Sequence, residues 1–307
     1  MRALIVTNMY PSPERPAFGS FVRDQVQALR RLAGVDVEVF SFSAGRPDAY
    51  LRAATELRRI HSRDRFDVVH AHFGLTAWPA LAAAGRVRAV TLHGTDLAHP
   101  RSRLISLAAL PFLDLVAVVS EPLERELPRW AAPAKIAVLP CGVDLARFRP
   151  IPRARARASL GLDPVGPYVL FAADPQRPEK RHDRAVAVAG DTRLLYLGDV
   201  DPIEVPLWVN AANAVLVPSE REGFGLAVLE ALACDVPVLA TPVGIAPVVL
   251  DGVDGAHCGA FDAEAWRVAL APHLSASDPR LVGRARAEAF SSDRMAARVL
   301  AAWREPR

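Results

Sequence analysis

Residues 218–244 read PSEREGFGLAVLEALACDVPVLATPVG, and this stretch decides the fold class. The apolar run 213–217 before it is typical of a buried strand, and it leads into a polar loop. A helical pattern then begins near Gly225, and a second apolar run follows at residues 236–240. The order of strand, loop, helix and strand predicts part of a parallel sheet that is covered by helices.

The same alternation continues along the whole chain. Short apolar runs are separated by amphipathic stretches, for example 21–32, 122–130 and 224–234. We expect strands at residues 3–7, 36–42, 67–71, 88–92, 115–119, 136–139, 168–173, 193–197, 213–217 and 236–240. Near-continuous apolar strands between helices indicate parallel sheets that are buried on both faces. The predicted fold class is therefore α/β.

The alternation is interrupted once, between residues 141 and 167. This segment reads CGVDLARFRPIPRARARASLGLDPVGP and shows no apolar period before Tyr168. We place a domain boundary here and expect two doubly wound, Rossmann-like domains, 1–150 and 151–307, facing each other across a cleft. Residues 263–307 have a helical pattern. This pattern is compatible with a terminal helix that crosses back to the first domain.

The composition is that of a globular protein. The chain has 307 residues, of which 51% are hydrophobic and 23% charged, which excludes a disordered chain and suffices for two cores. A strand-like run begins already at residue 3, so we do not expect a signal peptide. The longest apolar stretch, 104–119, is broken by Pro111 and Asp114, so no transmembrane helix is predicted.

The net charge of +3 is unevenly distributed. Residues 1–150 contain 20 Arg and Lys against 14 Asp and Glu, a net of +6, whereas the remainder has a net of −3. A basic first half fits an anionic surface or acceptor, and it fits a solvated surface equally well. No nucleic-acid partner is predicted.

The three cysteines, Cys141, Cys234 and Cys258, are odd in number and form no CxxC pair. They are typical of buried thiols in a reducing compartment and do not suggest a disulfide framework or a zinc site. We therefore expect a cytoplasmic protein.

The loop and helix within 218–244 carry the strongest chemical signal. Gly223 and Gly225 allow a ligand to approach the backbone at a helix N-terminus, where an anion is favoured. Glu222 lies in the loop, whereas Glu230 lies in a helix that is otherwise almost entirely apolar and is therefore expected to be buried. A buried carboxylate needs a partner, either a polar ligand or an ion pair. Glu222 also fits a simpler role, as an acid favoured by the helix dipole.

Glu222 and Glu230 are separated by seven residues in EGFGLAVLE, which resembles the E-x7-E motif of retaining GT-B glycosyltransferases of family 4. The resemblance extends over most of the chain, with several motifs in the same order. The similar segments are MRALIVTNMYPSPERPAFGSFVRDQVQAL, FDVVHAHF, VTLHGTDL, VVSEPLERELP, LPCGVDLARFRP, VLFAADPQRPEKRHDRA and DGVDG. The resemblance implies that domain 1–150 lies on the acceptor side and that domain 151–307 binds a nucleotide-sugar donor.

The resemblance also implies roles for single residues. Glu222 would contact hydroxyls of the donor sugar, and Glu230 the ribose hydroxyls. Lys180 matches the family lysine that holds the donor phosphates, a sensible position for a cation because charge develops on the leaving diphosphate. A solvated surface lysine is the alternative. The sugar and pyrophosphate would meet the backbone of Gly223, Phe224, Gly225 and Leu226.

The sequence departs from the family at the arginine that normally accompanies this lysine. Ala173 and Asp174 replace the usual Gly-Arg after the strand, and the loop is one residue longer. We assign the phosphate-binding role to Arg177, three residues before Lys180. Asp174 at the former arginine position has no explanation in the sequence.

In the first half, His93 of HGTD follows an apolar strand at its carboxyl end, where α/β proteins bind ligands. The resemblance implies that it contacts the donor sugar, although a lone histidine is more often structural. Gly19 opens the first long helix and matches the loop that approaches the phosphates and the acceptor, with Ser20 beside it. Asp96 of HGTD is a candidate for acceptor contact.

Two further features concern metals and length. Asp199-Val200-Asp201 is a DxD, the metal signature of the other glycosyltransferase fold, but we interpret it as a turn ending at Pro202. No metal and no cofactor other than the nucleotide-sugar co-substrate is predicted. One strand and helix of most family members are missing after residues 180–189, which leaves the base (UDP, GDP or ADP) open.

The sequence therefore predicts a metal-independent, retaining transfer of a sugar to an acceptor hydroxyl, in the synthesis of a surface polysaccharide, glycolipid or other glycoconjugate. The acceptor would be a sugar, a lipid-linked molecule or a small molecule. The alternatives are a nucleotide-sugar hydrolase or epimerase of the same fold, and a non-catalytic nucleotide-sugar binding protein. Residues 51–65 and 101–113 are rich in Arg and Leu and suggest peripheral contact with an anionic membrane, or else a solvated face.

Overall fold

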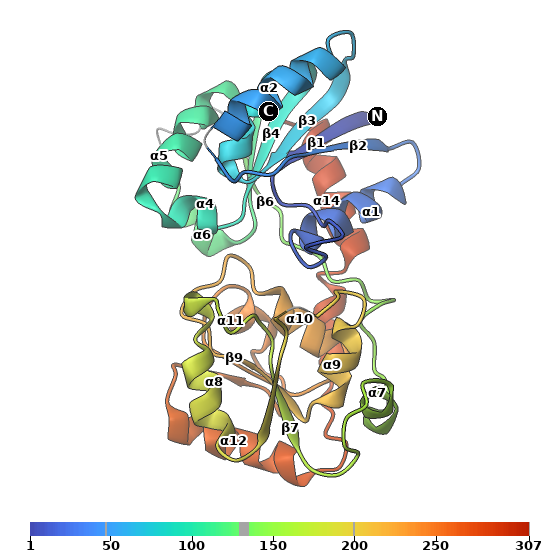
Figure 1. The fold of residues 1–307 in the computed structure, drawn as a ribbon, viewed down its shortest axis with the longest axis vertical. Helices are drawn as coiled ribbons and strands as arrows, with labels where there is room; N and C mark the ends of the chain where they lie inside the picture. The colour runs from blue at the N-terminus through green and yellow to red at the C-terminus, as the bar shows by residue number, and fades with distance from the viewer. Residues whose placement is uncertain (47, 129–134, 199, 307) are drawn as a thin grey trace. The chain divides into compact units, whose positions relative to one another are not determined.

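The computed structural model describes residues 1–46, 48–128, 135–198 and 200–306, and it consists of two units (Figure 1). Unit 1 comprises Met1–Gly142 and Ser292–Arg307, and unit 2 comprises Val143–Ser291. The division falls at residues 142 and 143, before the predicted boundary at residue 150. The terminal segment from Ser292 belongs to unit 1; the sequence placed it within 151–307 and left open a helix that crosses back to the first domain.

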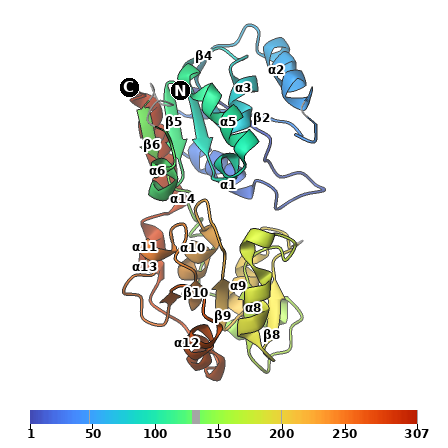
Figure 2. The same cartoon turned by 90° about the vertical axis from the view of Figure 1, so that its left-hand side faces the viewer.

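Unit 1 is built on a six-stranded parallel sheet in the order β2-β1-β3-β4-β5-β6. Figure 2 shows this sheet from β6 through β5 and β4 to β2. The order changes direction between β1 and β3, which makes the carboxyl ends of these two strands the switch point of the fold. The strands are β1 (Arg2–Thr7), β2 (Asp36–Ser41), β3 (Phe66–His72), β4 (Gly85–Leu92), β5 (Leu115–Val118) and β6 (Lys135–Val138).

Helices cover both faces of this sheet. On one face α1 and α14 pack against each other and bury Val26, Leu29 and Val299 over β1, β3 and β4. On the other face α3 packs on β1 and β3, with α2 and α5 beside it. The helices of unit 1 are α1 (Ser20–Arg30), α2 (Asp48–Ile60), η1 (Gly74–Thr76), α3 (Ala77–Ala80), α4 (Thr95–Ala98), α5 (Pro100–Ala109), η2 (Leu110–Phe112), α6 (Glu121–Arg125) and α14 (Ser292–Arg304).

Unit 2 has a five-stranded parallel sheet in the order β11-β10-β9-β7-β8, with its switch point between β7 and β9. One face is covered by α8 and α12, whose Trp266 and Leu270 are fully buried, and the other by α9 and α10. The strands are β7 (Tyr168–Phe171), β8 (Arg193–Tyr196), β9 (Ala214–Val217), β10 (Val238–Ala240) and β11 (His257–Cys258). The helices are α7 (Arg153–Ser159), η4 (Pro178–Lys180), α8 (His182–Ala189), α9 (Val205–Ala211), α10 (Leu226–Ala233), α11 (Ala246–Val249), α12 (Ala263–Ser275) and α13 (Arg284–Glu288).

The ten predicted strands are present, and their bounds differ by at most three residues from the prediction. The two-residue strand β11 was missed because so short a pairing carries no period. The predicted helix 122–130 corresponds to α6, and its last residues lie outside the described residues. No helix within the described ranges is long and apolar enough to cross a membrane.

The Arg-rich segment 153–159, where the sequence shows no apolar period, forms helix α7. The Arg153 guanidinium donates to the Ala212 carbonyl (2.9 Å), and the Arg157 guanidinium to the Asn213 Oδ1 (2.9 Å). Both arginine side chains are buried, and burial lowers the pKa of Arg153 to about 10. These arginines therefore fix α7 to the end of α9, a contact that a local pattern does not reveal.

Candidate functional site

The two charged residues singled out by the sequence meet at the switch point of unit 2. Lys180, at the end of η4, and Glu222, in the loop after β9, form a bidentate ion pair with Nζ–Oε distances of 2.7 and 2.6 Å. The two loops are also joined through the backbone, because the Glu220 N–H donates to the Glu179 carbonyl (2.9 Å). The Lys180 side chain is 15% exposed and that of Glu222 8%, so the pair is largely shielded from water.

Two hydroxyl residues that sequence reasoning missed support this pair. The Ser219 hydroxyl donates to Glu222 Oε1 (2.7 Å), and the Thr241 hydroxyl donates to the Ser219 carbonyl (2.5 Å). Both side chains are buried. Their position was a usable signal, because Thr241 follows β10 directly and Ser219 lies two residues after β9, so that both occupy the carboxyl edge of the sheet.

The backbone around Glu222 is tightly packed. Gly225 (φ 95°) precedes α10, and Gly244 (φ 60°) lies so close that a Cβ there would be 2.3 Å from the Phe224 carbonyl oxygen. The Ile245 N–H donates to that same carbonyl (2.7 Å). The Phe224 ring is buried, so only its backbone can face a ligand, whereas Gly223 and Leu226 keep part of their surface exposed.

Glu230 is not buried as the sequence suggested. It lies one helical turn after Leu226, and both are partly exposed, while Val228, Leu229 and Leu232 are buried. An apolar helix of eight residues therefore keeps one open stripe, and this stripe carries the carboxylate. The burial argument for Glu230 does not hold, and its proposed contact with a ribose remains a prediction.

Arg177 and Lys180 lie in the same loop, but their side chains take different partners. The Arg177 guanidinium is 50% exposed and pairs with Glu179 (2.6 Å), whereas Lys180 pairs with Glu222. Arg177 lines a shallow depression of about 700 Å³ together with Arg181 and His182. The phosphate-binding role of Arg177 remains a prediction.

Asp174, which the sequence left unexplained, has a local role in unit 2. Its Oδ1 accepts the Gln176 N–H (2.8 Å), and its carbonyl accepts the Arg177 N–H (3.1 Å). The carboxylate therefore forms an Asx turn that holds the loop before Lys180.

In unit 1, His93 lies directly after β4 and is joined to two further imidazoles. His93 Nε2 is 3.1 Å from His72 Nδ1, and the His72 and His93 rings stack with their centroids 5.3 Å apart. The His70 ring also stacks with the His72 ring, with the centroids 4.9 Å apart. Sequence reasoning missed His70 and His72, although their spacing of two in a strand places both on one face of the sheet.

These imidazoles are neutral near neutral pH. Burial lowers the pKa of His72 to about 3. Burial, and then the neighbouring imidazoles, hold the pKa of His70 and that of His93 well below the usual range. His93 keeps part of its surface exposed, whereas His70 and His72 are fully buried.

Asp96 is placed differently from the expectation that it contacts an acceptor. Its side chain is fully buried, and its carboxylate accepts the N–H groups of Gly74 (3.1 Å), His93 (3.1 Å) and Gly94 (2.8 Å). Desolvation by burial raises the pKa of Asp96, and these hydrogen bonds oppose that rise. Since its oxygens are occupied by the backbone, Asp96 holds the loop that carries His93.

Gly19 and Ser20 lie at the beginning of α1. Gly19 has φ 73°, and a Cβ at this position would be 2.2 Å from the Met9 carbonyl oxygen, so only glycine fits. The loop after β1 therefore lies directly against the helix N-terminus, near the switch point of unit 1. Ser20 is partly exposed in the first turn of α1, and its role on the acceptor side remains a prediction.

The DxD tripeptide is described only in part, because Asp199 lies outside the described residues. Asp201 Oδ1 accepts the Ile203 N–H (2.9 Å) in the turn before α9. Within residues 1–46, 48–128, 135–198 and 200–306, no group of three or more His, Cys, Asp or Glu is arranged to hold a metal ion. The metal independence of the reaction remains a prediction.

Comparison with known proteins relates the whole chain to sugar-transferring enzymes. Residues 18–147 match the family model described as Glycosyltransferase Family 4, and residues 150–275 match the one described as Glycosyl transferases group 1. The chain is 30% identical to the D-inositol 3-phosphate glycosyltransferase of Actinosynnema mirum, over 100% of this chain and 98% of that protein. It is 32% identical to the protein of the same name from Segniliparus rotundus, over 80% of this chain and 67% of that protein.

Solved structures share the fold. The sucrose-phosphate synthase from Thermosynechococcus elongatus has a TM-score of 0.76 and 21% identity, covering 99% of both chains. The Anabaena protein HepE, in complex with UDP and glucose, has a TM-score of 0.71 and 15% identity, covering 97% of this chain and 98% of that one. The two Rossmann-like parallel α/β domains are thus those of the GT-B architecture, as the sequence predicted.

Proposed function

The chain belongs to glycosyltransferase family 4, and we propose that it transfers a sugar from a nucleoside-diphosphate donor to an acceptor hydroxyl with retention of configuration. The observation that carries this proposal is the shielded Lys180–Glu222 pair at the switch point of unit 2. A lysine held at the carboxyl edge of a parallel sheet, beside the N-terminus of α10, is suited to a diphosphate.

In the proposed reaction the bond between the anomeric carbon and the diphosphate oxygen breaks. The acceptor oxygen forms the new bond on the same face, and its proton passes to the departing diphosphate. Lys180 offsets the charge that develops on this diphosphate, and no protein nucleophile is required. A diphosphate at Lys180 Nζ would compete with Glu222, which frees the Glu222 carboxylate to accept sugar hydroxyls.

The relatives suggest which substrates to test first. Those named D-inositol 3-phosphate glycosyltransferase point to a phosphorylated polyol or sugar as acceptor, and the HepE structures with UDP or UDP-glucose point to a uridine donor. Thermal melting with a panel of nucleoside diphosphates and nucleotide sugars would identify the base, because ligands of the folded state raise the melting temperature.

The catalytic test is the pair of variants Lys180→Ala and Glu222→Ala. We expect each to lower kcat at least about a hundredfold, because each removes a group that acts on the donor. Circular dichroism at the assay temperature should show that both variants are still folded, so that the loss is chemical, and full activity in either variant would contradict the site. Donor consumption without a glycosylated product would favour a hydrolase or epimerase. Tight donor binding without any turnover would favour a binding protein.

We also propose peripheral contact with an anionic membrane on the cytoplasmic face, for transfer to a lipid-linked acceptor. Its support is an apolar patch formed by the exposed side chains of Trp78, Leu104, Ile105 and Phe112. Trp78 contacts two other members of the patch: its indole N–H donates to the Ile105 carbonyl (3.0 Å), and its ring centroid is 5.9 Å from that of Phe112. No acidic residue occurs between residues 97 and 113.

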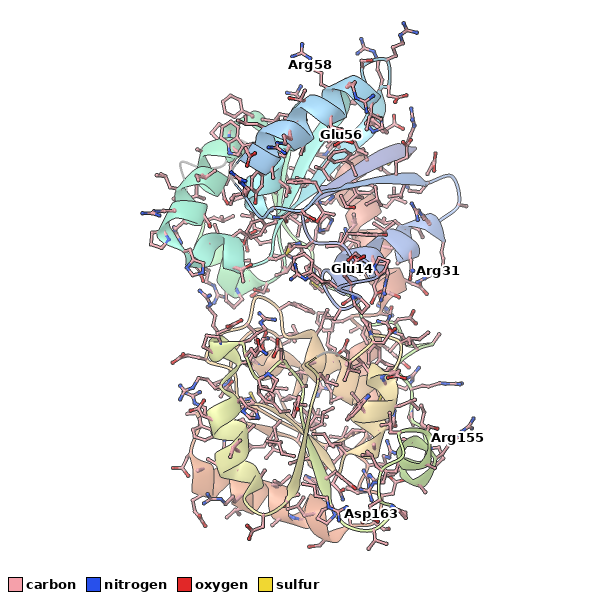
Figure 3. The ribbon with its side chains drawn as sticks, viewed as in Figure 1. Glu14, Arg31, Glu56, Arg58, Arg155 and Asp163 are labelled. Carbon is pink, nitrogen blue, oxygen red and sulfur yellow. The ribbon has the colours of Figure 1, made fainter. Side chains whose placement is uncertain are left out.

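Exposed arginines lie on α5, which carries part of this patch, and on α2. Arg101 is exposed in the first turn of α5, and Arg58 projects outward from α2, which packs on α3 (Figure 3). Aromatic and aliphatic side chains beside arginines are suited to an anionic interface. Flotation with anionic vesicles at low salt should recover the protein, and Leu104→Asp should reduce the recovery. The matched control is Val282→Asp, at a 91% exposed position in unit 2, and equal loss in both variants or no flotation would remove the idea.

A further inference from the structure

Polar side chains line one face of the unit 1 sheet where β3 and β4 end. Val68 and Ala89 are core residues on this face, and the following positions on the same side are His70 and His72 in β3 and Thr91 in β4. The face is covered by α1 and α14, so these side chains are enclosed by two helices that are far apart in the sequence. Buried polar groups at such a place must satisfy one another.

The proton position on His70 follows from its neighbours. The Trp303 indole N–H can only donate, and it lies 2.9 Å from His70 Nδ1, which therefore accepts. A neutral His70 then carries its proton on Nε2 and donates to the Thr91 hydroxyl (2.7 Å). His70 is thereby fixed in one tautomer by α14 and does not exchange protons with the ring stacked on it.

A second chain of hydrogen bonds begins at α1 and ends at His93. The Gln25 Nε2 amide lies 3.2 Å from His72 Nε2 and donates to it. His72 Nε2 is then the accepting nitrogen, so the His72 proton resides on Nδ1 and is donated to His93 Nε2 (3.1 Å). A neutral His93 with Nε2 accepting must carry its own proton on Nδ1.

We propose that Gln25 and His72 are positioning residues that fix His93 as a neutral imidazole with its proton on Nδ1, offered as a hydrogen-bond donor to an oxygen of the bound sugar. The identity of that acceptor rests on the proposed function, whereas the tautomer is a property of the protein alone. The second ring nitrogen determines the role of the first, as in other sites where a partner sets the tautomer of a histidine.

The electrostatics of the site support a neutral donor. The lowered pKa values of His70, His72 and His93 keep these three side chains uncharged over the physiological pH range. The Phe21 ring lies 4.8 Å from the His93 ring, centroid to centroid, and adds an apolar wall beside it. A neutral N–H in this place binds a hydroxyl oxygen without the desolvation cost of a buried cation.

The first test is ¹⁵N NMR of the full-length protein with labelled histidines and no substrate. We expect His93 to show a protonated Nδ1 and a bare Nε2, and His70 to show the opposite pattern. A protonated Nε2 on His93 would overturn the proposal. Because the measurement needs no turnover, its outcome is independent of the proposed transferase reaction.

The second test reverses the direction of the hydrogen bonds between residue 25, His72 and His93 with the variant Gln25→Glu. A carboxylate accepts only, so a neutral His72 must carry its proton on Nε2 and accept from His93 Nε2 at Nδ1, which leaves His93 Nδ1 bare. We expect the NMR pattern of His72 and His93 to invert and kcat/KM to fall about tenfold or more. The control is Gln27→Glu, which adds the same charge on the exposed side of α1 and should change neither.

A third test uses two variants of His72 to separate its hydrogen bonding from its packing. His72→Asn keeps an N–H near the former Nδ1, whereas His72→Leu removes it, so kcat should be partly restored in the first and low in the second. Equal kcat in both variants would mean that His72 serves packing only. An unchanged His93 tautomer beside a His72 that the same spectrum shows to be neutral in Gln25→Glu would likewise overturn the proposal.

Discussion

Unit 1 and unit 2 both place polar side chains at the carboxyl edge of a parallel sheet, but they bury them in different ways. In unit 2 opposite charges are paired, with Lys180 held by Glu222 at 2.6 Å and a buried hydroxyl behind them. In unit 1 the charge is removed, because burial lowers the pKa of His72 to about 3 and leaves a chain of neutral rings.

The difference shows that the two sheet edges offer different chemistry. A lysine that is paired with a carboxylate keeps its charge. It can exchange this partner for a phosphate, because one anion replaces another. Neutral imidazoles with fixed protons provide directional hydrogen bonds for hydroxyl groups and add no charge. The two edges are therefore expected to respond differently to mutation and to pH.

The largest effect is expected from breaking the charged pair in unit 2. Lys180→Met and Glu222→Gln should each destabilise unit 2 by about 3 kcal/mol, because each leaves an unpaired partner in a shielded site. The double variant should recover most of this loss, since no lone charge remains. Hydrogen exchange of the whole chain checks this, with unit 1 peptides as the internal control. Additive losses in the double variant would show that the charges are not coupled.

An intermediate effect is expected from removing the indole donor in unit 1. Trp303→Phe leaves His70 Nδ1 without its partner and should cost about 2 kcal/mol, seen as faster hydrogen exchange in β3 and α14. The matched variant is Trp266→Phe, whose indole N–H donates to the Ala260 carbonyl (3.2 Å) in unit 2. Each variant should affect only its own unit, and a loss spread over both would contradict the assignment.

The smallest effect is the change in stability between pH 7 and pH 6. His72 has a native pKa of about 3 against 6.5 for the free side chain, so between these values the unfolded chain binds the extra proton. The contribution of His72 to the free energy of unfolding is therefore fully present above about pH 6.5. It is lost as the pH falls, by about 1.4 kcal/mol per pH unit. The raised pKa of Asp96 changes the stability in the opposite direction, and it does so equally in the wild type and in a variant that lacks His72.

Urea unfolding at pH 7, 6 and 5 measures this slope in the wild type and in His72→Asn. The variant should lose less stability on acidification, by the share of one histidine. Equal slopes would show that His72 is not held neutral in the folded state.

Much of the candidate site was predictable where local spacing carried it. The glycines at 19 and 225 were identified as helix-start positions, and both have positive φ in the structure. The sequence was less informative where burial depends on neighbours. Glu230 was expected to be buried because its helix is apolar, yet one stripe of α10 stays open. Arg153 and Arg157 lie in a segment without an apolar period, yet both are buried against carbonyls at the end of α9.

The α/β class, the succession of strands along the chain and the presence of Glu222, Lys180 and His93 in family motifs could all be read from the sequence. These follow from periods of two and 3.6 residues and from short motifs, which are local. The folded structure was needed to show that Lys180 binds a carboxylate 42 residues away and that Trp303 donates to a histidine 233 residues away. Such contacts depend on which strands and helices become neighbours, and local patterns do not encode that choice.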